Sequence, residues 1–154
     1  MPVIGLISDT HGLIRPGIAA AFDGVERILH AGDVGDGVLE ALSRLAPVDA
    51  VFGNVDDPAD PALRRQRSLT VGGVTIHVSH GHELGRPTPD LLLARYHGDV
   101  LVFGHTHKAV VVRAEGRLVV NPGAAGPRRF DLQPSVARLT IDNGAADVEI
   151  ISLA

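Results

Sequence analysis

One stretch decides the fold, and it reads Val-Leu-Val-Phe-Gly-His-Thr-His at residues 100–107. Its four apolar residues predict a buried strand, which Gly104 ends. His105 and His107 stand two positions apart, so in extended backbone their imidazoles point to the same side. Imidazole is the commonest metal-binding side chain and the usual catalytic base. Two surface histidines in a loop would explain the stretch equally well if it stood alone.

The composition limits the compartment and the chemistry. The chain has 154 residues, which predicts one domain over residues 1–154 with an aliphatic core, since 45% of the residues are hydrophobic and only 3% aromatic. The absence of cysteine excludes disulfides, thiolate metal sites and cysteine nucleophiles. No apolar run approaches the length of a membrane span, and the net charge of −4 offers no basic surface for nucleic acid. We therefore expect a cytoplasmic protein with neither a membrane nor a nucleic-acid partner.

The hydrophobic pattern predicts strands alternating with helices in the first half and hairpins in the second. The segment 58–67, rich in proline and arginine, is expected to be an irregular surface segment, and Asp36 is expected to cap a helix whose inner face includes Leu45. Gly72-Gly73 and Asn143-Gly144 predict hairpin turns, and Thr88 is expected to cap the third helix. The predicted strands are 2–7, 27–30, 48–52 and 100–103, the helices 16–23, 36–44 and 88–97, and the hairpins 69–78, 110–120 and 135–152.

Polar side chains follow five of these strands at the point where each ends. Ligands of open α/β sheets usually bind at the carboxyl ends of strands, so these residues are expected to meet. Taken alone, Asp9 could be a helix cap with His11 a bystander, and His30, inside its strand, is expected to pack or to support a ligand. The candidate metal ligands are Asp9, His11, Asp33, Asn54, His80, His105 and His107.

Seven such side chains are too many for one ion and suit two ions that share a bridging carboxylate. Two divalent cations about 3.5–4 Å apart can clamp the attacking and leaving oxygens of a phosphoryl transfer. Oxygen and imidazole ligands without sulfur favour Mn²⁺, Fe, Zn²⁺, Ni²⁺ or Co²⁺ without selecting one of them, and we expect Mn²⁺.

Five short motifs follow one another along residues 9–107, in the order Asp-x-His, Gly-Asp, Gly-Asn, His-Gly-His and Gly-His-Thr-His. This set resembles the calcineurin-like metallophosphoesterase superfamily, and the turn Asn121-Pro122-Gly123 with the small size is similar to its single-domain phosphodiesterases of YfcE type. The resemblance covers about residues 4–123. It implies an α/β fold of two mainly mixed β-sheets packed together and flanked by helices, a four-layer sandwich.

The resemblance also implies roles for the ligands. Asp9, His11, Asp33 and His107 would hold one ion, and Asp33, Asn54, His80 and His105 would hold the other, with Asp33 bridging. A hydroxide held between the ions would attack phosphorus in line, because metal binding lowers the pKa of water to roughly 7.

One position departs from the larger superfamily. Its third motif typically reads Gly-Asn-His-Asp/Glu, and the histidine helps to protonate the leaving group. Here the stretch is Gly53-Asn54-Val55-Asp56, and valine cannot donate a proton. The small phosphodiesterases also tend to lack this histidine. His82 is a candidate for the missing acid because it lies close to His80 in sequence, and Asp56 is a candidate for supporting a ligand from behind.

The sequence favours a metal-dependent phosphodiesterase with a small phosphoester substrate. No arginine or lysine is securely placed at the motifs to receive the extra charge of a monoester. Two alternatives remain open, a phosphomonoesterase or nucleotide phosphatase with the same site, and a non-catalytic metal-binding interaction scaffold, since a retromer subunit shares the fold. A scaffold could lose ligands, and none is lost here. Small relatives often form homo-oligomers, so oligomerisation is a further expectation.

Overall fold

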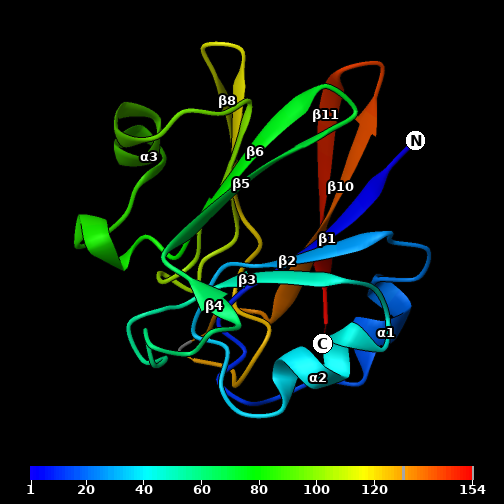
Figure 1. Cartoon of the computed structure of the whole chain (residues 1–154), viewed down its shortest axis with the longest axis vertical. Coiled ribbons are helices and arrows are strands. Elements are labelled where there is room, and N and C mark those ends of the chain that lie inside the picture. Colours follow the sequence, from blue (N-terminus) through cyan, green and yellow to red (C-terminus); the bar gives the residue numbers. More distant parts are fainter. Residues whose placement is uncertain (130, 154) are drawn as a thin grey trace.

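A computed structural model describes residues 1–129 and 131–153 as two mixed β-sheets packed face to face (Figure 1). The six-stranded sheet has the order β11-β10-β1-β2-β3-β4, and the five-stranded sheet has the order β5-β6-β7-β9-β8. The strands of the first sheet are β1 (Val3–Ile7), β2 (Arg27–His30), β3 (Val48–Val51), β4 (Leu63–Arg64), β10 (Ser135–Asp142) and β11 (Ala145–Ser152). Those of the second are β5 (Gln66–Val71), β6 (Val74–Ser79), β7 (Val100–Val102), β8 (Val110–Ala114) and β9 (Arg117–Asn121).

The main core lies between the two sheets and is aliphatic. On β1, Ile4 and Leu6 face the other sheet, while Val3 and Ile7 face the helices, as the alternation of side chains along a strand requires. Ile76 and Val102 approach from the second sheet. The predicted aliphatic core is therefore confirmed.

Three short α-helices cover the outer faces of the sheets. In Figure 1, α1 (Gly17–Ala21) and α2 (Val38–Ser43) lie beside the six-stranded sheet, and α3 (Pro89–Arg95) lies on the opposite side of the molecule. Phe22 and Leu42 pack with the first pair, and Leu92 packs with α3. A 3₁₀ turn, η1 (His82–Leu84), follows β6. The predicted sandwich of two sheets flanked by helices is confirmed.

The predicted turns and the cap of α3 are also confirmed. Asn143 and Gly144 join β10 to β11 with φ angles of 51° and 77°, the left-handed pair that a tight hairpin needs. Gly72-Gly73 joins β5 to β6. The Thr88 hydroxyl accepts a hydrogen bond from the Leu91 N–H at the start of α3.

Three details of the prediction are wrong. Asp36 does not cap α2, because the helix begins two residues later at Val38 with Gly37 at its N-cap. Leu45 is 41% exposed because the helix ends at Ser43, before the apolar stripe reaches that residue. The segment 58–67 contains β4, which pairs in parallel with β3, and the first residues of β5.

Strand direction brings the candidate ligands to one edge of the molecule. The strands β1, β2 and β3 run parallel, as do β6, β7 and β9 in the other sheet. Their carboxyl ends therefore meet at one end of the sandwich, which is where the polar segments follow.

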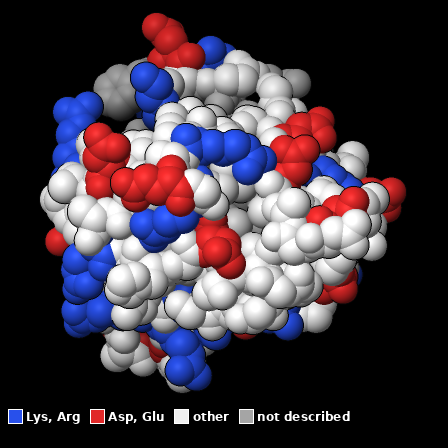
Figure 2. Space-filling view, turned by 90° about the horizontal axis from the view of Figure 1, so that it is seen from above, with Lys and Arg blue, Asp and Glu red and all other residues white. Residues whose placement is uncertain are grey.

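The charged side chains of the visible face (Figure 2) do not gather into patches of one sign. Acidic and basic side chains are interspersed on the face shown in Figure 2, with broad uncharged areas between them. Among the described residues, no helix combines the length and apolar character needed to cross a bilayer.

Candidate metal centre

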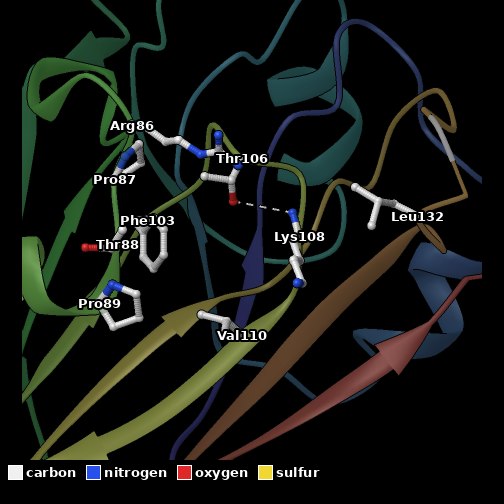
Figure 3. Close-up of a pocket in the computed structure, with 9 residues that line it drawn as sticks. All are labelled: Arg86, Pro87, Thr88, Pro89, Phe103, Thr106, Lys108, Val110 and Leu132. Atoms are coloured by element: carbon white, nitrogen blue, oxygen red, sulfur yellow. Dashed lines mark hydrogen bonds between the residues drawn. The ribbon is translucent and has the colours of Figure 1, made fainter.

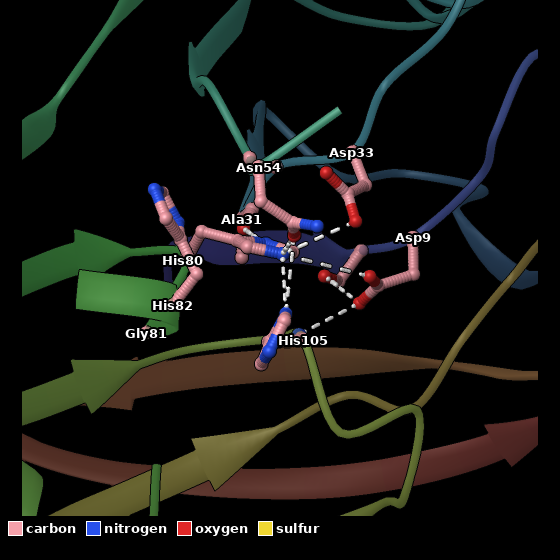
Figure 4. Close-up of polar contacts among 12 residues, drawn as sticks. Asp9, Ala31, Asp33, Asn54, His80, Gly81, His82 and His105 are labelled. Carbon is pink, nitrogen blue, oxygen red and sulfur yellow. Dashed lines mark hydrogen bonds and ion pairs between the residues drawn. The ribbon is translucent and has the colours of Figure 1, made fainter. Parts of the chain in front are cut away.

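All seven candidate ligands lie in loops at this edge and form one cluster. Figure 4 shows five of them, namely Asp9, Asp33, Asn54, His80 and His105. Asp9 and His11 follow β1, Asp33 follows β2 and Asn54 follows β3. The second sheet contributes the remaining histidines from the ends of β6 and β7, namely His80, His105 and His107. Segments 96 residues apart in sequence meet here, since the His105 N–H donates to Asp9 Oδ2 at 3.1 Å.

One group consists of Asp9, His11 and His107, whose potential ligand atoms lie within 4.8 Å of one another. His107 Nε2 is 3.4 Å from Asp9 Oδ1, and His11 Nε2 is 3.9 Å from the same oxygen. One carboxylate oxygen thus faces two imidazoles, which is a suitable arrangement for a divalent cation.

A second group consists of Asp33, His80 and His105, again within 4.8 Å. His80 Nε2 is 3.2 Å from Asp33 Oδ2 and 3.3 Å from His105 Nδ1. Asn54 Oδ1 lies 3.1 Å from each of these two ring nitrogens.

The Asp33 carboxylate connects the two groups. Its Oδ2 atom is 3.2 Å from His80 Nε2 and 3.7 Å from His11 Nε2, so it faces one imidazole of each group. A carboxylate in this position has the geometry of a bridging ligand. The assignment of each residue to an ion stays a prediction.

The ligand backbones differ from the prediction of extended chain. Asp9, His11, Asp33, His105 and His107 have φ angles between 47° and 71°, in the left-handed region. Outside glycine this region is uncommon, and strained conformations concentrate at functional sites, where the surrounding fold holds them. The extended backbone predicted for His105 and His107 is therefore wrong, and the tight turns send the two imidazoles to different groups.

Gly53 and Gly104 have no room for a side chain, because other residues of the cluster lie against their Cα atoms. A Cβ atom on Gly53 would lie 2.0 Å from Asp33 Oδ1, and one on Gly104 would lie 2.0 Å from Ser8 Oγ and 2.7 Å from Asp9 Oδ2. Any larger residue would therefore displace a candidate ligand. This explains glycine before Asn54 and before His105.

Partners behind the ligands fix their orientation. His80 Nδ1 donates to the Ala31 carbonyl at 2.8 Å, which directs Nε2 toward the cluster. Burial alone would lower the pKa of His80, but the hydrogen bond and charge of Asp33 and the charge of Asp9 raise it above its ordinary value. Ser8 Oγ similarly donates to Asp9 Oδ2.

Asp33 is held in its charged form. Burial opposes this charge and would raise the pKa. The hydrogen bond from His80, the positive charge of His80 and the hydrogen bond from the Val55 N–H outweigh burial and lower the Asp33 pKa to about 2. The pKa of Asp9 is also lowered, although it is fully buried, because His107, His80 and Ser8 favour its charge.

His30 connects the loops after β1 and β2. Its Nδ1 accepts from the Gly32 N–H at 3.1 Å, so Nε2 carries the hydrogen and donates to Thr10 Oγ1 at 2.9 Å. Thr10 Oγ1 in turn donates to the Val34 carbonyl at 2.6 Å. Burial lowers the pKa of His30 to about 4, so the ring is neutral at pH 7. His30 makes these contacts outside the metal-competent groups, as its position inside β2 suggested.

Asp56 connects the loops that carry Asp33 and Asn54. Its carboxylate accepts from the Val34 and Gly53 N–H groups at 3.0 Å and 2.9 Å, and from that of Gly35 at 3.3 Å. Asp56 therefore contacts the candidate ligands indirectly, by holding the backbone of the loops that carry them.

Asn121 holds the histidine loop. Its amide nitrogen donates to the Gly104 carbonyl and to Thr106 Oγ1, each at 3.1 Å, while its oxygen accepts from the Gly123 N–H. Sequence reasoning found the Asn-Pro-Gly turn but gave its asparagine no role at the site.

The cluster fits a metal by two independent observations. Asp9 Oδ1 and His11 Nε2 are buried and, within the described residues, have no hydrogen-bond partner, although they face each other at 3.9 Å. Buried polar atoms are rarely left unsatisfied unless a bound ion, a bound water or a functional role accounts for them. The donor set of carboxylate, amide and imidazole also matches first-row divalent cations.

Two further positions lie at the rim. His82 stands beside the cluster in Figure 4, with its ring centroid 5.3 Å from that of His80 and 6.4 Å from that of His105. Its Nδ1 atom is buried and has no hydrogen-bond partner in the described chain. Val55 is 62% exposed, and its N–H donates to Asp33 Oδ1 at 3.1 Å.

Comparison with known families decides the class of this site. The sequence model of the calcineurin-like phosphoesterase superfamily domain matches residues 3–144. The chain belongs to this superfamily. A relative named a probable metallophosphoesterase, from Methanothermobacter thermautotrophicus, is 38% identical, with 97% of this chain and 91% of that protein covered. A Bacillus subtilis relative with the same description is 35% identical, with 93% and 86% covered. A phosphodiesterase of Methanocaldococcus jannaschii is 28% identical, with 78% and 82% covered.

Solved structures of other proteins show the same fold. Vps29 from Entamoeba histolytica superposes with a TM-score of 0.81 at 22% identity, covering 97% of this chain and 98% of that one. A structure titled as that of a novel archaeal phosphodiesterase has a TM-score of 0.76 at 23% identity, covering 97% and 99%. At these identities the likeness concerns the fold, and it agrees with the two-sheet sandwich described above.

Proposed function

We propose that this phosphoesterase is a phosphodiesterase that uses two divalent metal ions, with Mn²⁺ as the expected metal. The observation that carries the proposal is the convergence of seven oxygen and nitrogen donors in two groups, with the Asp33 carboxylate between them. The phosphodiesterase of M. jannaschii among the relatives supports the choice of substrate class.

The two groups support an assignment of residues to each ion. Asp9, His11 and His107 would hold one ion, His80, His105 and Asn54 would hold the other, and Asp33 would contribute to both. When bound, such ions supply Lewis-acid charge and lower the pKa of water into the neutral range. The chain itself keeps Asp9 and Asp33 ionised, so that both carboxylates are ready to ligate at neutral pH.

Other residues hold the loops of this centre in place, and one of them is a candidate proton donor to the leaving group. Asp56, His30 and Asn121 hold the loops, so the donors require little rearrangement when they ligate. The side chain of Val55 cannot donate a proton to a leaving group. His82, at the rim of the second group, is the candidate donor.

The preference for diesters follows from charge. A monoester carries one more negative charge than a diester. Asp9 and Asp33 are paired with histidines, and no arginine or lysine among the described residues pairs with either carboxylate. This supports a diester, which brings less negative charge to the candidate ligands than a monoester does.

The test measures hydrolysis of bis(4-nitrophenyl) phosphate before and after metal removal. Chelation should abolish activity and Mn²⁺ should restore it, while Asp33→Asn should reduce kcat/KM by several orders of magnitude with folding retained by circular dichroism. Asp147→Asn, at a carboxylate that is 89% exposed and far from the motifs in sequence, is the matched control and should retain full activity. Full activity after metal-verified chelation would overturn the proposal.

Substrate class is tested separately with 4-nitrophenyl phenyl phosphate and 4-nitrophenyl phosphate, which share a leaving group. We expect a higher kcat/KM for the diester. A clear preference for the monoester would favour the phosphomonoesterase alternative, and metal binding without hydrolysis of either ester would favour the scaffold.

A further inference from the structure

A cavity of about 390 Å³ lies between the start of α3 and β8, and the loop that follows β7 contributes to its wall (Figure 3). Much of its wall is apolar, since Pro87, Pro89, Phe103 and Val110 contribute to it. Its volume lies at the lower end of the range for small-molecule sites, which suits a single ring or a group of similar size. Phe103 is 2% exposed, so its ring belongs to the packed structure and forms a preformed wall.

The cavity shares its wall with the metal site. Thr106 lines it and lies between His105 and His107, and Lys108, which also lines it, directly follows His107. Thr106 Oγ1 receives a hydrogen bond from the Asn121 amide at 3.1 Å, so the shared wall is held in place from behind. Thr106 and Lys108 therefore connect the cavity wall directly to the backbone of two candidate ligands, His105 and His107.

Two cations line the cavity without counter-ions. The side chains of Arg86 and Lys108 form no ion pair or hydrogen bond with another described residue, and no acidic residue is among the lining residues. Many other arginines are occupied: Arg27 and Arg67 contact Asp49, and Arg117 donates to three backbone carbonyls. In a chain with a net charge of −4, two unpaired cations in one cavity form a local site for an anion.

We propose that this cavity binds one ester arm of the phosphodiester, and that this arm carries a flat apolar body with an anionic group held by Arg86 and Lys108. This inference rests on the proposed phosphodiesterase function and narrows its substrate class. The apolar wall contacts the body of the arm, and the cations contact its anion. Figure 3 shows Arg86 and Lys108 extending from different segments around the same space.

Arg86 and Lys108 bind the anionic group of the ester arm and not the reacting phosphoryl group. Neither Arg86 nor Lys108 contacts Asp9 or Asp33, whose ion pairs are made by histidines. They lie in the cavity lined by Pro89 and Val110, and neither of these residues belongs to the ligand groups. They are therefore specificity-determining residues for the arm.

The test compares two diesters with the same 4-nitrophenolate leaving group. Their other arms are 4-carboxyphenyl and 4-carbamoylphenyl, which have similar size and differ in charge. For the metal-loaded wild type we expect kcat/KM to be about three- to tenfold higher for the carboxylate, as two partly exposed ion pairs would give. The ratio is independent of the active fraction of each preparation, so partial misfolding of a variant does not affect it.

Arg86→Gln combined with Lys108→Gln should bring this ratio close to one, because the carboxylate arm loses the cations that favour it over the carboxamide arm. Arg65→Gln removes one charge of the same sign from an exposed residue that does not line the cavity, and it should keep the wild-type ratio. A wild-type ratio of one, or a ratio that survives the double substitution, would overturn the inference.

A second measurement separates this inference from the proposed function. Metal-free protein is titrated with 4-hydroxybenzoate and with 4-hydroxybenzamide while backbone amide NMR shifts are followed. We expect the carboxylate to bind at least threefold more tightly, with shifts in residues 103–110 and a loss of this preference in the double variant. Equal affinities or shifts confined to other regions would overturn cavity recognition, whether or not the metal-loaded protein hydrolyses diesters. Recognition without any hydrolysis would instead overturn the proposed function alone.

Discussion

Most residues of the candidate centre carry a metal-competent side chain on a backbone conformation that is energetically unfavourable for residues other than glycine. Five of the seven ligands have left-handed φ angles, which cost about 1–2 kcal/mol per residue for side chains other than glycine. This strain is maintained because the loops are joined by hydrogen bonds such as Asp9 N–H to the Gly32 carbonyl and His11 N–H to the Asp33 carbonyl. The fold thus holds the donors in directions that an isolated loop would not adopt.

Position 55 allows the source of the leaving-group proton to be tested. General acid assistance is typically worth about 10²–10⁴-fold and matters most for poor leaving groups. If His82 supplies the proton, the rate of the wild type should depend weakly on leaving-group pKa, and His82→Ala should make the dependence steep. Val55→His in the His82→Ala background should then restore a shallower slope, because position 55 is exposed beside Asp33.

The measurement is kcat/KM for a series of aryl methyl phosphates of increasing phenol pKa. His97→Ala, at an exposed histidine outside the ligand groups, is the control and should keep the wild-type slope. A steep slope in the wild type would mean that no residue donates the proton. A shallow slope that persists in His82→Ala would assign the proton to a different group.

At the level of elements, the contact between the loops after β1 and β2 depends on a neutral histidine. Burial lowers the pKa of His30 to about 4, below the value of about 6.5 for an unfolded histidine. Between these values the unfolded chain binds a proton that the folded chain does not. The contribution of His30 to stability is therefore complete above pH 6.5 and is lost as the pH falls toward 4.

This predicts that the metal-free wild type loses about 2 kcal/mol of unfolding free energy at pH 5 through His30. His30→Gln should be less stable at pH 7.5, because the hydrogen bonds to Thr10 and Gly32 are altered, but should lose less stability on acidification. Urea unfolding at pH 7.5 and pH 5 measures both effects, with the exposed His97→Gln as control. Identical losses in wild type and His30→Gln would contradict the prediction.

The sequence predicted the elements whose signals are local. The apolar runs of β1, β2 and β7, each followed by small or polar residues, located the ligand-bearing strand ends, and Asn143-Gly144 located a hairpin. The two-residue strand β4 was missed because its existence depends on pairing with β3 and not on its own composition.

Features formed by distant segments could not be read from the sequence. The left-handed backbones of His105 and His107 depend on contacts of their loop, including the bond from the His105 N–H to Asp9. Similarly, Arg86 and Lys108 are 22 positions apart, and only the fold places them in one cavity. Residue type identified the donors, whereas tertiary structure determined their grouping.

On the scale of the whole molecule, the metal centre is a junction between the two sheets. Asp9, Asp33 and Asn54 follow strands of the six-stranded sheet, while His80 and His105 belong to the five-stranded sheet. Ions bound here would connect both layers of the sandwich, and the unfolded chain has no such preformed site. Metal binding should therefore stabilise the entire fold by mass action.

The slope of the unfolding free energy against the logarithm of free metal concentration therefore reports how many ions the folded protein binds. Well above the dissociation constants, each bound ion adds about 1.4 kcal/mol of unfolding free energy per tenfold increase in free metal, so two ions add about 2.7 kcal/mol. We expect the two-ion slope for the wild type in urea unfolding at buffered free Mn²⁺. His107→Ala removes a ligand of the first group only and should reduce the slope to that of one ion, whereas the exposed Asp147→Asn should retain the wild-type slope. A wild-type slope of one ion would exclude the dinuclear centre while leaving a metal site, and a slope of zero would exclude Mn²⁺ binding to the folded protein.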